Sequence, residues 1–396
     1  FLVRCSSVFY VHFQPDVILQ EYLEFMQGKG FFTDDKIYAL AGWLYINGES
    51  PDAFNFAHPP LAKYLIGVSE LLFKNQAALG LAVSVLTLSF VYLISRRVVA
   101  ASPFALLPVF ILSLDRMYIS FSSTSMLDIY ATLFVVLSAY LLVNVRRRWA
   151  PVLLYVAVGL ALSCKWITAF LLVLLPLYYV VKKDSSQLKY YPLGLALTAL
   201  TYTLSYAAFF LAGNTLQDFF SLQFNMLTCH QQNRLKVGMP PPLWILLNFL
   251  TGIEGPTQIQ TLFLNPKELT IATTFPESGL ALISAYNPLT WPISFSATIL
   301  TAYYSLKENR QIAAIPLAFL ILLASVSYGK AFIWYLLPVL PFAFISLAYM
   351  TDRIYGGSRK RVAAKVTLVL YLILLVVWSV LVEVPPYLKG LNVKII

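Results

Sequence analysis

Charged residues are scarce in this chain of 396 residues. Asp, Glu, Lys and Arg together make up 12% of it, against the roughly 25% that is usual in soluble domains. Hydrophobic residues make up 59%. A chain so poor in charge and so rich in apolar residues is typical of a membrane protein and excludes an ordinary soluble enzyme.

Cysteines are also few, and a glycine-rich loop is missing. Cys5, Cys164 and Cys229 have no paired spacing, so the sequence predicts neither a zinc site nor a disulfide framework. A single Cys5–Cys229 bridge stays open, and Cys164 is interpreted as part of the core. The chain has no glycine motif of the kind that cradles a nucleotide, which argues against nucleotide binding of that type.

Long hydrophobic runs are what the sequence has instead. A helix needs roughly 20 apolar residues to cross a bilayer. Uncharged runs near that length lie at 76–95, 166–181, 190–212, 288–306, 311–328, 331–350 and 366–382, and shorter or interrupted runs lie at 101–114, 126–145 and 150–163. Residues 1–13 are interpreted as the outer end of a truncated first span. We therefore expect an all-α polytopic membrane protein of about eleven spans, with one domain over residues 1–396.

The distribution of basic residues predicts the orientation of these spans. The net charge of the chain is +10, but fifteen of its 28 basic residues and only three of its 18 acids fall in one set of loops. That side therefore carries a net charge of +12, and the rest of the chain −2. Because cytoplasmic loops are enriched in Lys and Arg, the basic side is predicted to be cytoplasmic. The charge then needs no nucleic-acid partner to explain it.

This orientation places two large loops outside the cell. The first covers residues 14–75, and its run 17–26 has the amphipathic pattern of an interfacial helix. The second covers residues 213–287 and contains His230 among glutamines and asparagines. Loops of this length are usually functional. We therefore expect both loops to contribute to a site at the outer surface of the plasma membrane.

The first outer loop contains the most polar stretch of the chain. Asp34 and Asp35 are adjacent, and the aromatic residues Tyr38 and Trp43 follow them. Adjacent carboxylates on an outer loop can act as a general base, as metal ligands or as solvated charge. The rings next to them suit both the face of a sugar and the membrane interface.

A second motif follows about two dozen residues later. His58-Pro59-Pro60 precedes a helical pattern over residues 61–73, and a proline at the start of a helix pre-sets the backbone. His58 then lies at a helix N-terminus, where the dipole favours an anion. Lys63 is one turn further on and is a candidate partner for a phosphate. Together the two motifs suggest an anionic, phosphate-bearing ligand beside a base.

These motifs resemble the protein O-mannosyltransferase family, in which an acidic pair precedes a His-Pro-Pro-Leu-x-Lys helix. Two departures are visible: Asp35 stands where the family has Glu, and residues 122–125 contain no basic residue. The family's large lumenal sugar-binding insert is also missing, so the chain resembles a prokaryotic, archaeal-type member. The matching segments are Asp34-Asp35-x-x-Tyr38, His58-Pro59-Pro60-Leu61-x-Lys63, Leu114-Asp115, Met126-Leu127-Asp128, Gly159 to Lys165-Trp166, and Trp334-Tyr335-x-x-Pro338-x-x-Pro341-Phe342.

The resemblance implies a GT-C fold and an inverting transfer of a hexose, such as mannose, from dolichyl or polyprenyl phosphate to Ser or Thr hydroxyls of a protein acceptor. It implies no required cofactor, although a divalent metal stays open, and no nucleic acid; membrane lipids and a dimer or larger complex are the other expected partners. The residues assigned are Asp34 as base, Asp35 and His58 as orienting groups, Lys63, Arg116 and Lys330 for the donor phosphate, and Tyr38, Trp43, Asp128 and His230 for the substrate.

Several of these residues also have plain structural interpretations. Asp115 and Asp128 can cap helices or pair with Arg116, and Lys165, at a break between apolar runs, can pair inside the bundle. His230 can be an ordinary loop histidine. Two other classes of function also remain open: a GT-C transferase acting on lipid or polysaccharide, and a transporter or membrane subunit without catalytic activity.

Overall fold

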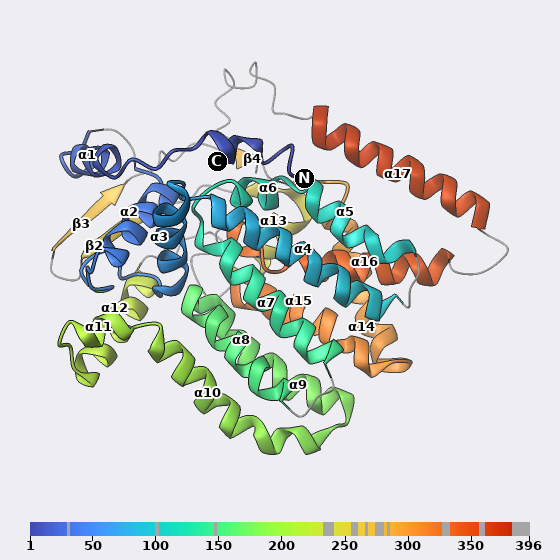
Figure 1. Ribbon diagram of the computed structural model, residues 1–396. Helices are drawn as coiled ribbons and strands as arrows, with labels where there is room; N and C mark the ends of the chain where they lie inside the picture. The colour runs from blue at the N-terminus through green and yellow to red at the C-terminus, as the bar shows by residue number, and fades with distance from the viewer. Residues whose placement is uncertain are drawn as a thin grey trace.

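The computed structural model describes residues 1–29, 32–99, 103–145, 149–232, 241–254, 260–265, 268–273, 281–282, 286–326, 333–355 and 361–381. The described chain is nearly all helical, with long helices packed side by side and shorter elements gathered at one end (Figure 1). This arrangement confirms the predicted fold class.

The first half of the described chain contains the helices that surround the candidate site. They are η1 (Ser6–Tyr10), α1 (Pro15–Met26), α2 (Asp34–Ile46), α3 (Leu61–Phe73), α4 (Ala78–Val98), η2 (Pro103–Leu106), α5 (Leu107–Leu114), α6 (Arg116–Ser122), α7 (Leu127–Asn144), α8 (Ala150–Cys164), η3 (Trp166–Phe170) and α9 (Leu171–Lys182).

The second half completes the bundle. It comprises η4 (Ser185–Tyr190), α10 (Tyr191–Leu204), α11 (Ala207–Leu211), α12 (Leu216–Gln232), α13 (Pro241–Thr251), α14 (Trp291–Lys307), η5 (Arg310–Ala313), α15 (Ala314–Val326), η6 (Ile333–Leu336), α16 (Leu340–Tyr355) and α17 (Arg361–Leu381).

Two small antiparallel strand pairs lie in the second predicted outer loop. β1 (Ile253–Glu254) pairs with β4 (Ala281–Leu282), and β2 (Gln260–Asn265) pairs with β3 (Glu268–Thr273). The sequence analysis does not predict them. Their threonines, isoleucine and phenylalanine are residues that favour strands, and the pairs are too short to change the fold class.

Every apolar run named above contains a helix of the bundle. Among the described residues, α4 and α7 each reach the length and hydropathy needed to cross a bilayer. The bent pair Pro103–Leu114 and Arg116–Ser122, which turns by 65°, would be a third span, and the other apolar helices are shorter. The total of eleven spans therefore stays a prediction.

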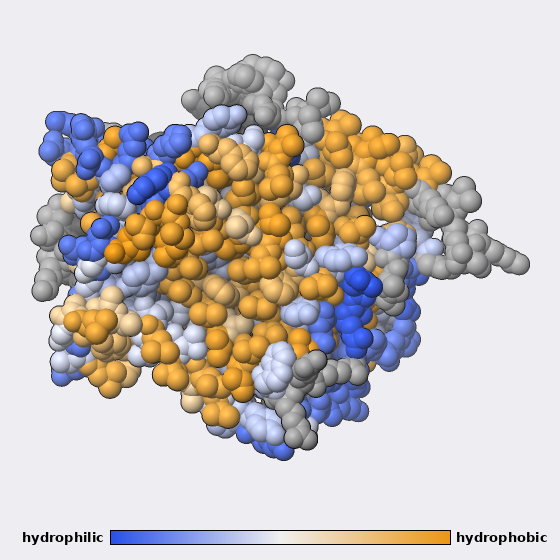
Figure 2. Space-filling view, in the orientation of Figure 1, coloured by the Kyte–Doolittle hydropathy of each residue, from blue (hydrophilic) through white to orange (hydrophobic). Residues whose placement is uncertain are grey.

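Basic side chains gather at one end of the bundle, as the sequence predicts. Arg96 and Arg97 lie in the last turn of α4 and Lys182 in that of α9. Arg310 donates to the carbonyl of Val181 at 3.3 Å. Figure 2 shows hydrophilic residues at the upper left and lower right of the molecule, with a hydrophobic belt between them. The bundle thus has two polar ends and an apolar middle.

The first outer loop folds into a helical layer that presents the candidate site. α2 and α3 pack against one another at two glycines: a Cβ on Gly42 would lie 2.7 Å from the backbone nitrogen of Gly67, and a Cβ on Gly67 only 2.3 Å from the carbonyl oxygen of Gly42. The helix expected over residues 61–73 is α3, and the interfacial run is α1. The close α2–α3 contact fixes the two motifs of this loop relative to each other.

The three cysteines are buried free thiols, so the Cys5–Cys229 bridge is not formed. Cys5 and Cys229 belong to separate hydrophobic clusters, which explains why they do not meet. Cys164 lies in the main core, as predicted.

Glu70 on α3 gives the protein a predicted pH dependence. Its side chain is fully buried, and among the described residues neither carboxylate oxygen has a hydrogen-bond partner. Burial raises the pKa of Glu70 from 4.5 to about 9. The folded state therefore binds more protons than the unfolded state between these values, and stability falls as pH rises through them, by at most about 1.4 kcal/mol per unit.

We expect the unfolding midpoint of the purified protein to fall between pH 5 and pH 9, and Glu70→Gln to flatten that fall. Glutamine keeps the size of the side chain and cannot ionise. Thermal unfolding in one detergent at several pH values measures the effect. An unchanged slope in Glu70→Gln would show that other groups cause the pH dependence.

Candidate active site

Asp34 and Asp35 form the first turn of α2, with Thr33 as the N-cap residue. Acidic side chains in the first turn are favoured by the helix dipole. The sequence predicts a loop for this pair, whereas the structure has a helix, in which neighbouring side chains diverge by about 100°. Both aspartates are half-buried. The backbone carbonyl of Asp35 accepts a 2.7 Å hydrogen bond from Ser125, which attaches the start of α2 to the segment before α7.

The Asp34 carboxylate interacts electrostatically with a group of buried side chains. Its charge acts on Tyr38, one turn further along α2, and on Lys165 and Tyr335, which come from distant parts of the chain. Burial and then the charge of Asp34 raise the pKa of Tyr38 well above its usual value. The phenol of Tyr38 therefore stays protonated and can donate a hydrogen bond at physiological pH.

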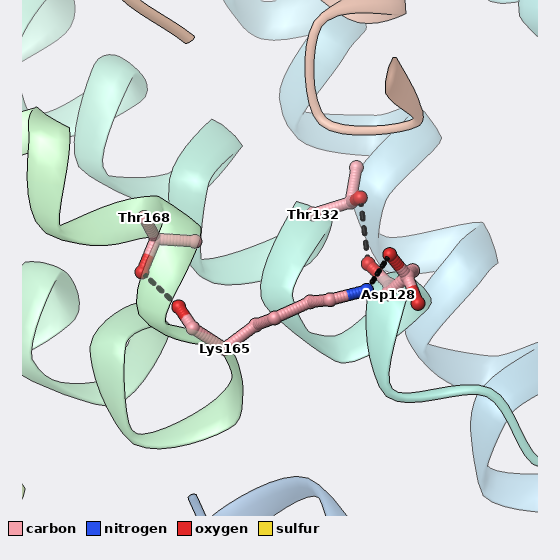
Figure 3. A network of polar contacts seen from close by, with 4 residues as sticks. All are labelled: Asp128, Thr132, Lys165 and Thr168. Carbon is pink, nitrogen blue, oxygen red and sulfur yellow. Dashed lines mark hydrogen bonds and ion pairs between the residues drawn. The ribbon is translucent and has the colours of Figure 1, made fainter. Parts of the chain in front are cut away.

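Lys165 is held in this group by an ion pair and by an aromatic ring. Its Nζ lies 2.5 Å from Oδ1 of Asp128, as Figure 3 shows, and 3.9 Å from the centroid of the Tyr335 ring. Lys165 is 3% exposed and Asp128 is 1% exposed. Buried charges are retained when they are paired in this way. The structural interpretation of Lys165 is thus confirmed, with Asp128 as its partner.

The pair also changes the assignment of Asp128. The sequence predicts substrate binding for this residue, whereas the structure uses one of its carboxylate oxygens to hold Lys165. Lys165 lies at the break between α8 and η3, where the backbone is extended. That break turns the lysine toward α7 and brings a cation close to Asp34.

Lys63, which is predicted to bind the donor phosphate, is engaged by the protein itself. Its side chain is fully buried, and Nζ donates to the hydroxyl of Tyr45 at 3.3 Å, to the carbonyl of His58 at 2.9 Å and to the carbonyl of Asn55. Burial lowers the pKa of Lys63 well below its usual value. With three acceptors around its amine, Lys63 closes the loop before α3, and we do not assign it to a phosphate.

His58 and His230 bring the two predicted outer loops together. The centroid of the His58 ring lies 5.9 Å from that of Tyr38 and 5.2 Å from that of His230. Nε2 of His230 lies 2.7 Å from the carbonyl oxygen of Ala57. The second outer loop therefore reaches the His-Pro-Pro motif through α12.

A short chain of hydrogen bonds supports this contact. The Trp166 indole, directly after Lys165, donates to the Tyr202 hydroxyl at 2.8 Å, and Tyr202 donates to Oε1 of Gln223 at 2.6 Å. The Trp166 ring also lies 6.2 Å from that of His230. η3, α10 and α12 are thereby joined beside the candidate site.

Three other assigned residues have different outcomes. Trp43 lies nine residues beyond Asp34 on α2, or about 13 Å along a helix, and packs against Phe13 with ring centroids 5.5 Å apart. It therefore belongs to the core of the loop and not to the group around Asp34. Arg116 begins α6, and its role at the phosphate stays a prediction. Lys330 lies outside the described residues.

The chemistry that this arrangement supports is proton transfer beside a fixed cation. Asp34 is a half-buried carboxylate whose charge acts on Tyr38, and the ring of His58 lies beside that of Tyr38. Lys165 supplies a positive charge that Asp128 holds in place. Among the described residues, no three His, Cys, Asp or Glu side chains are grouped so that they could bind a metal. The prediction that no cofactor is required is not tested by that observation.

Lys165 and Tyr335 are the site residues that the sequence assignment misses. Both lie in segments noted for their resemblance to the family, Lys165-Trp166 and Trp334-Tyr335. That signal could have placed them in the site. Both residues are far from Asp34 in the sequence, so the sequence alone gave no indication that the three side chains interact.

A family model described as dolichyl-phosphate-mannose-protein mannosyltransferase matches residues 57–209. The resemblance predicted from the sequence is therefore confirmed over this segment. The segment includes His58, Asp128 and Lys165, and it excludes Asp34 and Tyr335. No curated protein is significantly similar to the sequence.

Solved structures identify the fold. The structure of ArnT from Cupriavidus metallidurans bound to undecaprenyl phosphate matches 81% of this chain with a TM-score of 0.58 and 16% identity, and its apo state matches with a TM-score of 0.57 and 15% identity. The Archaeoglobus fulgidus oligosaccharyltransferase tethered with an acceptor peptide matches 88% of the chain at 13% identity, with a TM-score of 0.48. The chain spans about half the length of these structures, 56%, 55% and 49% respectively. The two ArnT matches thus confirm the GT-C fold predicted from the sequence.

Proposed function

We propose that this chain is a membrane glycosyltransferase that moves a hexose, mannose in the first instance, from dolichyl or polyprenyl phosphate to Ser or Thr hydroxyls of a protein. The observation that carries the proposal is the position of Asp34: a half-buried carboxylate at the start of α2 whose charge acts on a buried lysine, on a GT-C fold. The family match over residues 57–209 and the undecaprenyl phosphate in the ArnT structure support the lipid-linked donor.

The proposed reaction is a single inverting displacement. The acceptor oxygen forms a bond to the anomeric carbon as the bond from that carbon to the phosphate oxygen breaks. Asp34 takes the proton of the hydroxyl, and the lipid phosphate leaves with the electron pair. A general base of this kind typically contributes 10²–10⁴-fold. Tyr38 and His58 orient the groups around Asp34, and His230 adds a contact from the second loop.

Positive charge is needed where the leaving phosphate gains negative charge. Fixed charges at such positions usually make the largest single contribution to stabilising a transition state. Lys165 replaces Lys63 in this proposal, since its charge already interacts with that of Asp34. Arg116 and Lys330 remain proposed ligands of the phosphate. Asp128 keeps Lys165 in place and makes no contact with substrate in this scheme.

The donor distinguishes this function from its alternatives. We expect the purified protein in nanodiscs to add one hexose to a Ser/Thr peptide when dolichyl-phosphate-mannose is supplied, detected as a mass shift of the peptide. Asp34→Asn protein is the control. Transfer from a nucleotide sugar without the lipid donor, or transfer only to a lipid or polysaccharide acceptor, would contradict the proposal.

The proposed orientation puts the site outside the plasma membrane. We expect a cysteine at Glu49 to react with a membrane-impermeant reagent on intact cells, and a cysteine at Lys189 to react only after permeabilisation. Both positions are exposed, and the three native thiols are buried. Labelling of both positions from the same side would reject the orientation.

A further inference from the structure

α12 presents a stripe of largely exposed apolar side chains. Leu216, Phe220 and Phe224 follow one another at intervals of four residues, and they are 59%, 62% and 67% exposed. Leu227 continues the line and is 37% exposed. Residues spaced in this way lie on one face of a helix. Three large apolar side chains, each more than half exposed on one line, form a patch rather than scattered surface residues.

The opposite flank of α12 is bound to the protein. This flank carries four side chains that are at most 5% exposed, namely Phe219, Leu222, Met226 and Cys229. They belong to one cluster with Tyr202 of α10, Phe209 of α11 and Tyr206 between the two helices. This flank also carries the residues that reach the candidate site, Gln223 and His230. The exposed stripe is therefore not the face by which α12 packs on the bundle.

A third stripe is polar and faces solvent. Gln217, Ser221 and Asn225 are exposed, and Asp218 lies beside them. Asp218 also takes part in the cap at the start of the helix. The Thr215 hydroxyl donates to the Asp218 carboxylate at 2.6 Å, and the Asp218 backbone N–H donates to the Thr215 hydroxyl at 3.2 Å. Such a reciprocal cap fixes the first turn. α12 thus has three faces, one against protein, one apolar and one polar.

The apolar stripe continues a surface that a membrane protein presents to lipid. α10 exposes Leu193, Leu200 and Leu204 at 58%, 55% and 63%, and Leu211 at the end of α11 is 87% exposed. α12 follows within five residues. In Figure 2 the surface at the lower left, where Figure 1 places α11 and α12, is largely hydrophobic. The exposed residues therefore run from the flank of the bundle onto the outer loop.

We propose that α12 is an interfacial helix whose Leu216–Phe220–Phe224 stripe lies in the headgroup–acyl boundary of the bilayer that holds the bundle. A helix that packs against a protein at a membrane surface needs one face for the protein, an apolar face for lipid and a polar face for water. α12 has three such faces. Interfacial helices bury an apolar face about 5–10 Å into that boundary. Because the same helix carries Gln223 and His230, contact with lipid positions the second outer loop over the His58 motif. This inference does not depend on the proposed transfer reaction.

Environment-sensitive labels test the placement. Cysteines at Phe220 and Phe224 are compared with matched cysteines at Ser221 and Asn225, in protein whose native cysteines are replaced. Each variant is labelled with a nitrobenzoxadiazole fluorophore in phosphatidylcholine nanodiscs. We expect labels at positions 220 and 224 to emit at shorter wavelength and to lose most of their fluorescence to doxyl-labelled lipids, while labels at 221 and 225 are quenched by aqueous iodide.

Equal quenching by iodide at all four positions would overturn the proposal. So would a disulfide between two copies of Phe224→Cys in a native membrane, because a second copy would then cover the stripe. A further measurement needs no substitution: a phosphatidylcholine with a photoreactive acyl chain should modify the segment 216–232 of the unaltered protein. Modification confined to the α4 and α7 segments would count against contact of α12 with lipid.

Discussion

Asp34→Asn is expected to abolish measurable hexose transfer while the protein still folds and binds its lipid donor. Asparagine keeps the size of the side chain but cannot take a proton, so the loss should reach the roughly 10²–10⁴-fold that a general base contributes. The half-buried Asp34 is a first-turn residue of α2, and its charge already acts on Tyr38, Lys165 and Tyr335. Initial rates of peptide modification, together with donor binding and the unfolding midpoint, measure the effect.

Asp35→Asn is the matched control for that experiment. The two aspartates are neighbours in one helical turn, and both are half-buried. The charge of Asp35, however, affects Tyr38 more weakly than the charge of Asp34 does. We expect Asp35→Asn to lower the rate less, or to lower stability as well. Near-normal turnover in Asp34→Asn would refute the general-base assignment, and loss only in Asp35→Asn would reverse it.

Lys165→Met is expected to lower both stability and transfer. It leaves Asp128 as a buried charge without its cation, and breaking a buried pair in this way costs about 3–5 kcal/mol. It also removes the cation beside Asp34. Denaturant unfolding in detergent measures the first effect, and peptide modification measures the second.

The double variant Lys165→Met/Asp128→Leu separates the two effects. Replacing both members of a buried pair by apolar residues is often neutral for stability, so we expect folding to recover. Transfer should stay low, because the positive charge near the leaving phosphate is still missing. A double variant that regains both folding and transfer would reduce Lys165 to a structural role.

The helices, their ends and the main motifs of this protein can be predicted from its sequence, because a bilayer and a helix both constrain residues that are close together in the chain. Apolar runs predict the helices, and the loops rich in Arg and Lys predict which helix ends lie together, as Arg310 at the carbonyl of Val181 illustrates. The motifs around Asp34 and His58 give the resemblance that the family model confirms over residues 57–209. These signals all depend on residues close to one another in the chain.

Tertiary structure decided which environments Lys63 and Lys165 have. Lys63 has the spacing of a ligand residue, yet the turn before α3 brings carbonyls to its amine and buries it. The sequence suggests only a structural ion pair for Lys165. The break between α8 and η3 directs its side chain to Asp128, where the charge of Asp34 also acts on it. The sequence determined which residue types are present and how they are spaced along helices. Only packing decided which of them are desolvated together, because that depends on helices that meet from distant parts of the chain.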